Sequence, residues 1–182
     1  MKKIIISILA IASMAFSANA QLYVGGLAGF DLTAPGSSTA FTFQLSPEVG
    51  YNISDKFAAG VALNMTPSVD SAQNVSVSTF TWNIQPYARF KFINIGNLNL
   101  FGDAAVALGT TGVSTRVEGL TETSNPIFQW SVGFYPGISY NFTQNWAVVT
   151  RIAGISYGGS KGANAFNLNV FRRLAIGFYY SF

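Results

Sequence analysis

The sequence lacks two residue types that carry much of protein chemistry, since it contains no cysteine and no histidine. Without cysteine the chain can form no disulfide and can hold no lipid on an N-terminal cysteine. Without histidine it cannot build the Ser-His or Asp-His pairs of most hydrolytic sites, and lacking both disfavours transition-metal sites. A pair of carboxylates could still act as acid and base, but no spacing singles one out. We therefore expect no enzyme activity, no metal and no cofactor.

Charge is also scarce: charged residues make up 9% of the 182-residue chain, whereas 49% of it is hydrophobic. Ordinary soluble domains carry about 25% charged residues, so this charge could hardly cover a water-facing surface. Yet no segment after residue 20 has the roughly 20 consecutive apolar residues of a membrane helix. Eighteen glycines and 15% aromatic residues favour strands and turns. The composition thus indicates a large apolar surface spread over strands.

Residues 1–20 are typical of a cleaved secretory signal peptide. Residues 1–3 (MKK) form a short positive region, "IIISILAIASMAF" is an apolar core, and residues 18–20 (ANA) fit the small-x-small cleavage rule. A retained anchor helix is the alternative, which the short apolar run disfavours. Cleavage before Gln21 would leave eight basic against seven acidic residues, with no basic patch for nucleic acid. We expect residues 21–182 to form one domain.

Beyond residue 20, apolar residues alternate at period two with small or polar ones, as in half-buried strands. The pattern predicts eight strands, near residues 22–32, 41–51, 57–66, 79–92, 98–109, 127–140, 146–157 and 166–182. Short turns at 52–56, 93–97 and 141–145 alternate with longer polar loops near 33–40, 67–78, 110–126 and 158–165. An up-and-down membrane barrel places its long loops at one end and its short turns at the other.

The apolar face of these strands is expected to lie outside. The other face is mostly Gly, Ala, Ser, Asn and Gln, which suits a narrow eight-stranded interior better than a solvated exterior. A soluble lipocalin-like barrel would have to bury the apolar face, which is too large and aromatic for that interior. We therefore predict an all-β fold, an eight-stranded antiparallel up-and-down transmembrane β-barrel.

A short motif recurs before the predicted turns. "PEVGYNISDKFA" (47–58) is similar to "PGISYNFTQNWA" (136–147), and "PYARF" (86–90) is a partial third copy. Each has a proline followed four residues later by an aromatic residue, namely Tyr51, Tyr140 or Phe90. Aromatic residues at one height suit a membrane interface, and each proline should thin the strand pairing because it lacks an N–H donor.

The chain ends in "FRRLAIGFYYSF", and this terminal Phe182 resembles the C-terminal assembly signal of bacterial outer-membrane proteins. Residues 21–182 resemble the small OmpA-like and OmpX-like barrels, and "SPEVGYNISDKFAAGVAL" and "AIGFYYSF" are most similar to the outer-membrane β-barrel family common in Bacteroidota. The resemblance implies a Gram-negative outer membrane location with both termini in the periplasm. It also implies recognition by the barrel-assembly machinery through Leu174, Ile176, Phe178, Tyr180 and Phe182. Enzymes among such barrels use a histidine, which is absent here. The cell-wall anchoring of full-length OmpA is not expected, because the sequence offers no peptidoglycan-binding domain after the predicted barrel.

The same period points six charges into the lumen, three acidic and three basic: Asp31, Glu48, Arg89, Asp103, Arg151 and Arg173. Buried charges are costly alone and should pair. We expect one network of Glu48, Arg89, Asp103 and Arg151 near the short turns, and a higher pair of Asp31 with Arg173 between the first and last strands. The favoured role of these charges is to fill the barrel core as satisfied pairs, and the alternative is that they form a gate.

Arg172 should point outward near the outer boundary of the membrane, where we expect it to contact a lipopolysaccharide phosphate. Ten residues separate it from Phe182, about the length of a spanning strand. A bulge that turns its side chain inward is the alternative.

Two functional classes remain. The first is a structural or surface-interaction barrel whose long loops contact a surface protein or ligand, and the second is an OmpW-like barrel that passes small apolar molecules. Bulky residues expected inside favour the first: Tyr23, Tyr87, Phe101, Tyr135, Phe171 and Tyr179. Expected partners are outer-membrane lipid, lipopolysaccharide and the assembly machinery, without nucleic acid. Residues 70–72 (DSA) also resemble the short O-glycosylation motif of Bacteroidota, which would modify Ser71 in a loop.

Overall fold

The computed structural model describes residues 22–34, 38–72, 75–117 and 120–182, with only the backbone of residues 169–174. The predicted signal peptide lies outside the described residues. The strands are β1 (Leu22–Thr33), β2 (Ser38–Asn52), β3 (Phe57–Ala72), β4 (Val75–Ile95), β5 (Leu98–Val117), β6 (Leu120–Thr123), β7 (Ile127–Asn141), β8 (Trp146–Ser160) and β9 (Ala163–Ser181). No helix within these ranges is long and apolar enough to cross a membrane.

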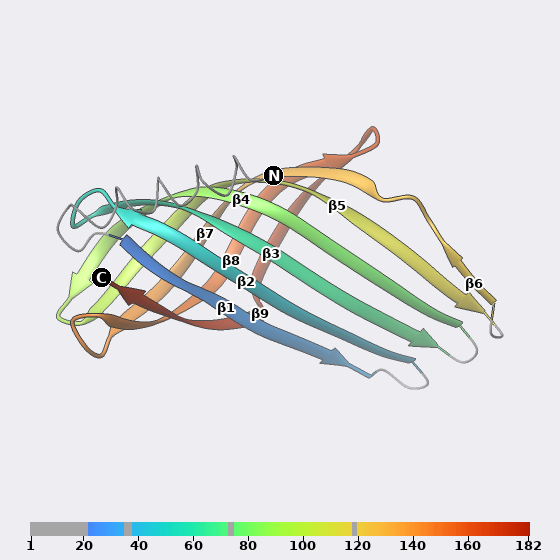
Figure 1. Cartoon of the computed structure of the whole chain (residues 1–182), viewed down its shortest axis with the longest axis horizontal. Helices are drawn as coiled ribbons and strands as arrows, with labels where there is room; N and C mark the ends of the chain where they lie inside the picture. Colours follow the sequence, from blue (N-terminus) through green and yellow to red (C-terminus); the bar gives the residue numbers. More distant parts are fainter. Residues whose placement is uncertain (1–21, 35–37, 73–74, 118–119) are drawn as a thin grey trace, which may run out of the picture.

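The strands form one antiparallel sheet that closes on itself (Figure 1). The first and last strands pair, with Tyr23 opposite Ser181 and Gly29 opposite Ala175. The short strand β6 folds back on the end of β5, where it pairs with Ser114–Val117. Strand β7 pairs with the rest of β5, from Leu98 to Thr111. The wall therefore consists of eight strands, and the predicted eight-stranded antiparallel barrel is confirmed.

The two ends of the barrel differ. The turn end carries the tight connections β2–β3, β4–β5 and β7–β8 together with Leu22 and Phe182. The backbone N–H of Phe182 donates a hydrogen bond to the carbonyl of Leu22 at 3.0 Å. The opposite end, the hairpin end, carries strand pairs that project well beyond the rest of the wall (Figure 1).

The prediction of long polar loops at this end is wrong in their length, because the strands continue through most of the residues assigned to them. Strands β3 and β4 fill most of 67–78, β5 and β6 fill most of 110–126, and β8 meets β9 at a tight turn of Lys161 and Gly162, both with positive φ. These segments are rich in Ser, Thr and Val, of which Thr and Val favour strands. They lose the apolar alternation because both faces of a projecting hairpin can meet water. Ser71 accordingly lies in β3 rather than in a loop, 3.2 Å from the hydroxyl of Ser76.

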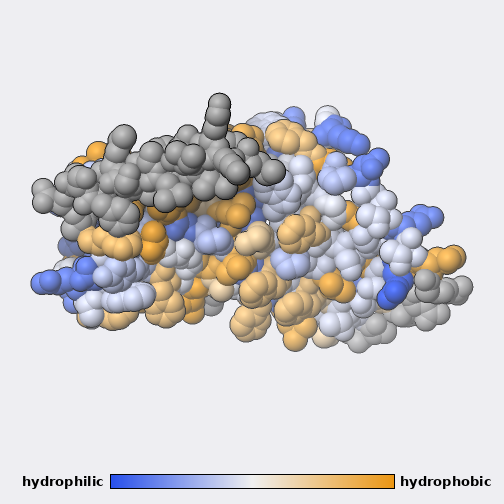
Figure 2. Space-filling view, in the orientation of Figure 1, coloured by the Kyte–Doolittle hydropathy of each residue, from blue (hydrophilic) through white to orange (hydrophobic). Residues whose placement is uncertain are grey.

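The outer surface of the wall is apolar, as predicted. On β2 the large hydrophobic residues Phe41, Phe43, Leu45 and Val49 are exposed, whereas the alternate positions Ser46 and Glu48 are buried. Strand β9 alternates in the same way, with Ile176 and Phe178 exposed and Ala175 and Tyr179 buried. Figure 2 shows hydrophobic side chains over the middle of one flank and hydrophilic residues at both ends. This distribution matches a barrel whose middle faces lipid.

Each of the three repeated prolines thins the pairing on one side of its strand, as predicted. Pro47 has no paired residue on β3, Pro86 has none on β5, and Pro136 has none on β8. At Pro136 the register between β7 and β8 also shifts. Proline lacks the N–H donor that the ladder needs at these positions.

Aromatic side chains gather at the turn end. The ring centroids of Phe57 and Phe90 lie 4.8 Å apart, and those of Trp146 and Tyr180 lie 5.0 Å apart. Tyr180 also meets Phe182 edge-on at 5.1 Å. Phe90, Tyr140 and Trp146 are all exposed on the outer face, as a belt at a membrane interface requires.

Candidate functional site: charges and aromatic rings in the lumen

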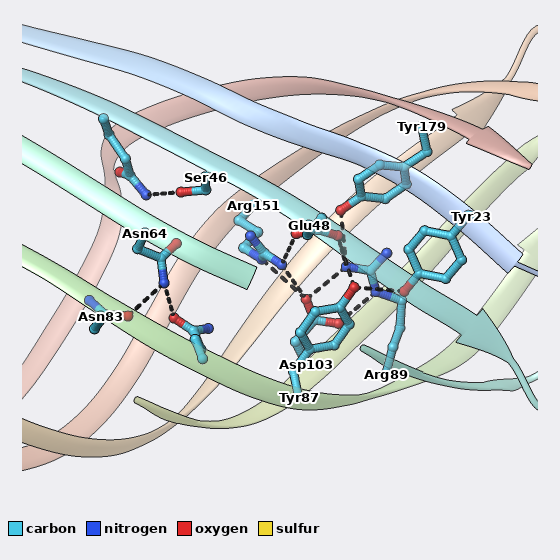
Figure 3. A network of polar contacts seen from close by, with 12 residues as sticks. Tyr23, Ser46, Glu48, Asn64, Asn83, Tyr87, Arg89, Asp103, Arg151 and Tyr179 are labelled. Atoms are coloured by element: carbon cyan, nitrogen blue, oxygen red, sulfur yellow. Dashed lines mark hydrogen bonds and ion pairs between the residues drawn. The ribbon is translucent and has the colours of Figure 1, made fainter. Parts of the chain in front are cut away.

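Four charged side chains meet inside the barrel, each from a different strand (Figure 3). Glu48 comes from β2, Arg89 from β4, Asp103 from β5 and Arg151 from β8. Every one occupies an inward position of the period-two pattern. The side chains of Glu48 and Asp103 are fully buried, and those of Arg89 and Arg151 are 5% and 14% exposed. These four residues are called the charge cluster below.

The charge cluster is held by short ionic hydrogen bonds. Arg89 donates from Nε to Oδ1 of Asp103 at 2.7 Å and from Nη2 to Oδ2 at 2.9 Å, a two-pronged pairing. Arg151 donates from Nη2 to Oε2 of Glu48 at 3.0 Å and to Oδ2 of Asp103 at 2.9 Å. A longer contact of 3.5 Å joins Nη2 of Arg89 to Oε1 of Glu48. Each arginine thus meets both carboxylates, and the cluster is neutral as a whole.

Four aromatic rings surround the guanidinium of Arg89. Its central carbon lies 4.1 Å from the ring centroid of Phe101, 5.2 Å from those of Tyr87 and Tyr179, and 5.9 Å from that of Tyr23. A cation over an aromatic face is attracted by the ring quadrupole, and more strongly where water is excluded. The charge cluster and these four residues together are called the lumen cluster.

The tyrosine hydroxyls extend the bonding of the charge cluster. The hydroxyls of Tyr23 and Tyr87 lie 2.7 Å apart, and Tyr87 donates to Oε1 of Glu48 at 3.0 Å. Arg89 also donates from Nη2 to the hydroxyl of Tyr179 at 3.2 Å. These bonds satisfy polar groups that would otherwise be costly to bury.

Glycines on the inner wall make room for the rings. A Cβ at Gly50 would collide with the ring of Tyr23, and a Cβ at Gly60 would collide with the hydroxyl end of Tyr87. A glycine in a strand often marks such a close approach. The small residues on the polar face of the sequence pattern therefore serve the packing of large ones from neighbouring strands.

Toward the hairpin end, amide side chains replace the charges. Asn64 donates from Nδ2 to Oδ1 of Asn83 at 2.8 Å and to Oε1 of Gln85 at 2.7 Å. Gln44 donates to the hydroxyl of Ser46 at 3.2 Å. Figure 3 shows these groups on one side of the charge cluster and Tyr23 and Tyr179 on the other.

The remaining predicted site residues lie apart from the lumen cluster or outside the described side chains. Asp31 accepts a hydrogen bond from the hydroxyl of Thr33 at 3.1 Å, at an exposed position. The side chains of its expected partner Arg173, and of Arg172, Leu174 and Phe171, lie outside the described residues. Tyr135 is partly buried and packs against the buried hydrophobic residues of the barrel interior. Within the described ranges, no three His, Cys, Asp or Glu side chains gather as metal ligands.

Sequence reasoning missed two groups of lumen residues. One group is the set of amide side chains around Asn64. The other group lines a polar cavity at the turn end and includes Lys91 and Asn99. Lys91 lies two residues after Arg89 on the same strand, so the period-two alternation places it on the inner face as well. The sequence pattern alone could therefore have predicted that Lys91 points into the lumen. A β-bulge follows it, since Lys91 lies opposite Phe101 but Ile93 lies opposite Leu100.

Comparisons with known proteins agree with this geometry. The sequence model of the family described as "Outer membrane protein beta-barrel domain" matches residues 4–182. No curated protein sequence matches the chain. The crystal structure of Neisserial surface protein A is similar with a TM-score of 0.56 and 19% identity, covering 88% of this chain and 97% of that one.

The attachment invasion locus protein Ail of Yersinia pestis is similar with a TM-score of 0.57 and 13% identity, covering 91% of this chain and 100% of that one. Ail in complex with the heparin analogue sucrose octasulfate is similar with a TM-score of 0.51 and 11% identity, covering 90% of this chain and 97% of that one. These likenesses show a shared fold, and the family match covers nearly the whole sequence. The chain therefore belongs to the outer membrane protein beta-barrel domain family, and the barrel described above is one of the Gram-negative outer membrane.

Proposed function

We propose that the protein is a non-enzymatic barrel whose lumen is closed by the lumen cluster and whose function lies at its hairpin end, in a structural or surface-interaction role. The observation that carries this proposal is the burial of Arg89, Asp103 and Phe101 in the lumen, where they are 4%, 0% and 1% exposed. A path for solutes would have to cross this layer. The paired charges and packed rings leave the outer ends of the barrel as the parts able to meet other molecules.

The hairpin end is suited to contact other molecules. Its strands project beyond the apolar belt, and the tip formed by β5 and β6 is exposed. It carries the polar residues Thr121, Glu122 and Thr123 together with the hydrophobic residues Val117 and Leu120. Ail, which shares the fold, is described in complex with a heparin analogue. We infer for this chain only that a surface ligand or protein binds at the hairpin end. The proposed orientation places this end outside the cell and both termini in the periplasm.

Biogenesis and membrane contact follow from the same arrangement. We propose that residues 1–20 are removed as a signal peptide, and that the assembly machinery recognises the terminal strand through Ile176, Phe178 and Phe182, whose side chains face outward. Leu174 and Tyr180 belong to the same proposed signal. We also retain the proposal that Arg172 contacts a lipopolysaccharide phosphate.

A complementation experiment tests the proposed role. A strain lacking the protein is supplied with the full-length chain or with a variant in which a two-residue turn replaces residues 113–124, the tip of the β5–β6 hairpin. The wall pairing of β5 with β7 ends at Thr111 and Ile127, so this trimming keeps that pairing and removes only the partners of Val75–Thr79 in the projecting part of β4. Envelope integrity is measured by sensitivity to detergent, and surface contact is measured by cross-linking on intact cells.

A role in surface interaction predicts that only the full-length chain restores the cross-linked products, and a structural role predicts that both chains restore detergent resistance. The OmpW-like alternative predicts a different outcome: slower uptake of small apolar compounds in the deletion strain, with an unchanged envelope and no cross-linked product. That result would overturn the proposal.

A further inference from the structure

A polar cavity of about 570 Å³ opens at the turn end, on the far side of the lumen cluster from the amide groups. Its size falls in the range of about 300–1,000 Å³ that is common for small-molecule sites. Asparagines from four strands and from the β7–β8 turn line it: Asn52, Asn94, Asn99, Asn141 and Asn145. Lys91 lies in its wall, and Arg89, Tyr23 and Tyr179 form its inner limit. We call this cavity the vestibule.

Lys91 brings a positive charge into the vestibule that the lumen cluster does not balance. Its ammonium donates a hydrogen bond to Oδ1 of Asn52 at 3.3 Å. Among the described residues, no carboxylate lies within ion-pair distance of it. Of the described residues that line the vestibule, Asp55 on the exposed β2–β3 turn is the one acidic residue. An anion entering the vestibule would therefore meet a cation that is still available.

Asn99 presents an amide to the same space. The residue is 6% exposed, and its side chain has no hydrogen-bond partner among the residues that the structure describes. Its amide atoms keep contact with the vestibule, since Oγ1 of Thr150 is the only fully buried side-chain polar atom without a partner among the described residues. Asn99 lies on β5 two residues before Phe101, which is opposite Lys91, so the two side chains are diagonal neighbours on the inner face.

Arg89 contributes a third donor at the inner limit of the vestibule. Its Nε and Nη2 donate all the hydrogen bonds that the guanidinium makes with the described residues, to Asp103, Glu48 and Tyr179. Within the described part of the chain, Nη1 has no acceptor. Figure 3 shows Arg89 at the side of the charge cluster where Tyr23 and Tyr179 lie, which is the side of the vestibule.

We propose that the vestibule binds a small polar molecule through a phosphate or carboxylate group, held by the ammonium of Lys91, the amide of Asn99 and the free Nη1 of Arg89. Oxyanions prefer such charge-assisted donors. The surrounding asparagines can donate to and accept from hydroxyl groups on the rest of the ligand. The site faces the end that carries both described chain ends, and it is independent of any surface role of the hairpins.

A titration of the purified, folded protein in detergent micelles tests this site. The probes are glucose 6-phosphate, glucuronate and glucose, which share a sugar ring but differ in their anionic group. Ionic strength is held constant with sodium chloride, since salt screens exposed charges. We expect the two anions to shift the side-chain amide signals of Asn99 saturably in nitrogen-15 NMR, whereas glucose leaves them in place. The phosphate and the carboxylate arms show which group the site prefers.

Lys91→Met should weaken binding of the preferred anion by about tenfold or more, as expected from the loss of one charge-assisted bond, and Lys91→Arg should retain it. Lys56→Met is the matched control, because Lys56 lies at the same end of the barrel on an exposed turn outside the vestibule lining. Equal weakening in both methionine variants would show general charge attraction and overturn the proposal. Absence of saturable shifts with both anions, or equal binding of glucose, would overturn it even if Lys91→Met failed to fold.

Discussion

Replacement of Arg151 by methionine removes one of the two cations of the charge cluster and leaves its carboxylates in place. Arg151 makes three hydrogen bonds of 2.9 to 3.1 Å, two to Asp103 and one to Glu48. Methionine replaces the aliphatic stem of the arginine and omits its guanidinium. The change therefore tests the charge pairing more than the packing.

The expected loss follows from the burial of the partners. The side chains of Glu48 and Asp103 are fully buried, and in the variant they would share Arg89 as their one remaining cation. Breaking a buried ion pair from one side usually costs about 3–5 kcal/mol, because an uncompensated charge stays behind. Arg151 is itself only 14% exposed, so we expect the free energy of unfolding to fall within this range.

The assay is denaturant unfolding of the refolded barrel in detergent, followed by tryptophan fluorescence and by heat-modifiable migration on gels. The double variant Arg151→Met with Glu48→Gln restores neutrality and should recover part of the loss. Arg116→Met is the control, since Arg116 is exposed near the tip of β5, and should change stability by no more than about 0.5 kcal/mol. An Arg151→Met variant as stable as the wild type, or a double variant weaker than the single one, would refute the pairing.

Three further changes probe other parts of the barrel. Phe101→Ala should lower the free energy of unfolding by about 3–5 kcal/mol, because a buried ring over Arg89 is removed; a loss below about 1 kcal/mol would contradict the packing described here. Deletion of Phe182 should reduce the heat-modifiable fraction in cell membranes while refolding in detergent stays efficient, and normal assembly in cells would count against an assembly signal. Trypsin added to intact cells should cut after Arg116 or Lys161, at the hairpin end, and should spare Lys56 at the turn end; the reverse pattern would invert the proposed topology.

The wall of the barrel could be predicted from the sequence because its side chains obey one simple period. The alternation that ends in Ile176, Phe178 and Phe182 assigns each residue to lipid or lumen, and the observed exposure follows it. The number of strands follows from the turns between the alternating segments. Both are local properties of the chain.

The length of the hairpins could not be predicted in the same way. Beyond the lipid, residues such as Ser76 and Thr115 need not alternate with apolar ones, so the sequence signal of a strand fades although the strand continues. Cross-strand pairing, which connects Ser76 to Arg116 across two strands, is not visible in either segment alone.

The partners inside the lumen depend on barrel geometry more than on local pattern. The period places Glu48 and Arg151 on the inner face, but their 3.0 Å contact joins residues 103 positions apart in the chain. That proximity depends on how the strands are staggered around the barrel. The vestibule was missed for a similar reason, since the bulge after Lys91 and the register of Asn99 set the shape of its wall.

Single-channel recording of the refolded wild-type barrel in a planar lipid bilayer tests most directly whether the lumen cluster closes the barrel. With Arg89, Asp103 and Phe101 almost fully buried across the lumen, we predict insertion without steady conductance over a range of voltages. Insertion is verified separately by protease protection in vesicles, so that silence cannot come from absent protein. A stable, reproducible ion-conducting state of the inserted wild type would contradict a closed, charge-paired lumen.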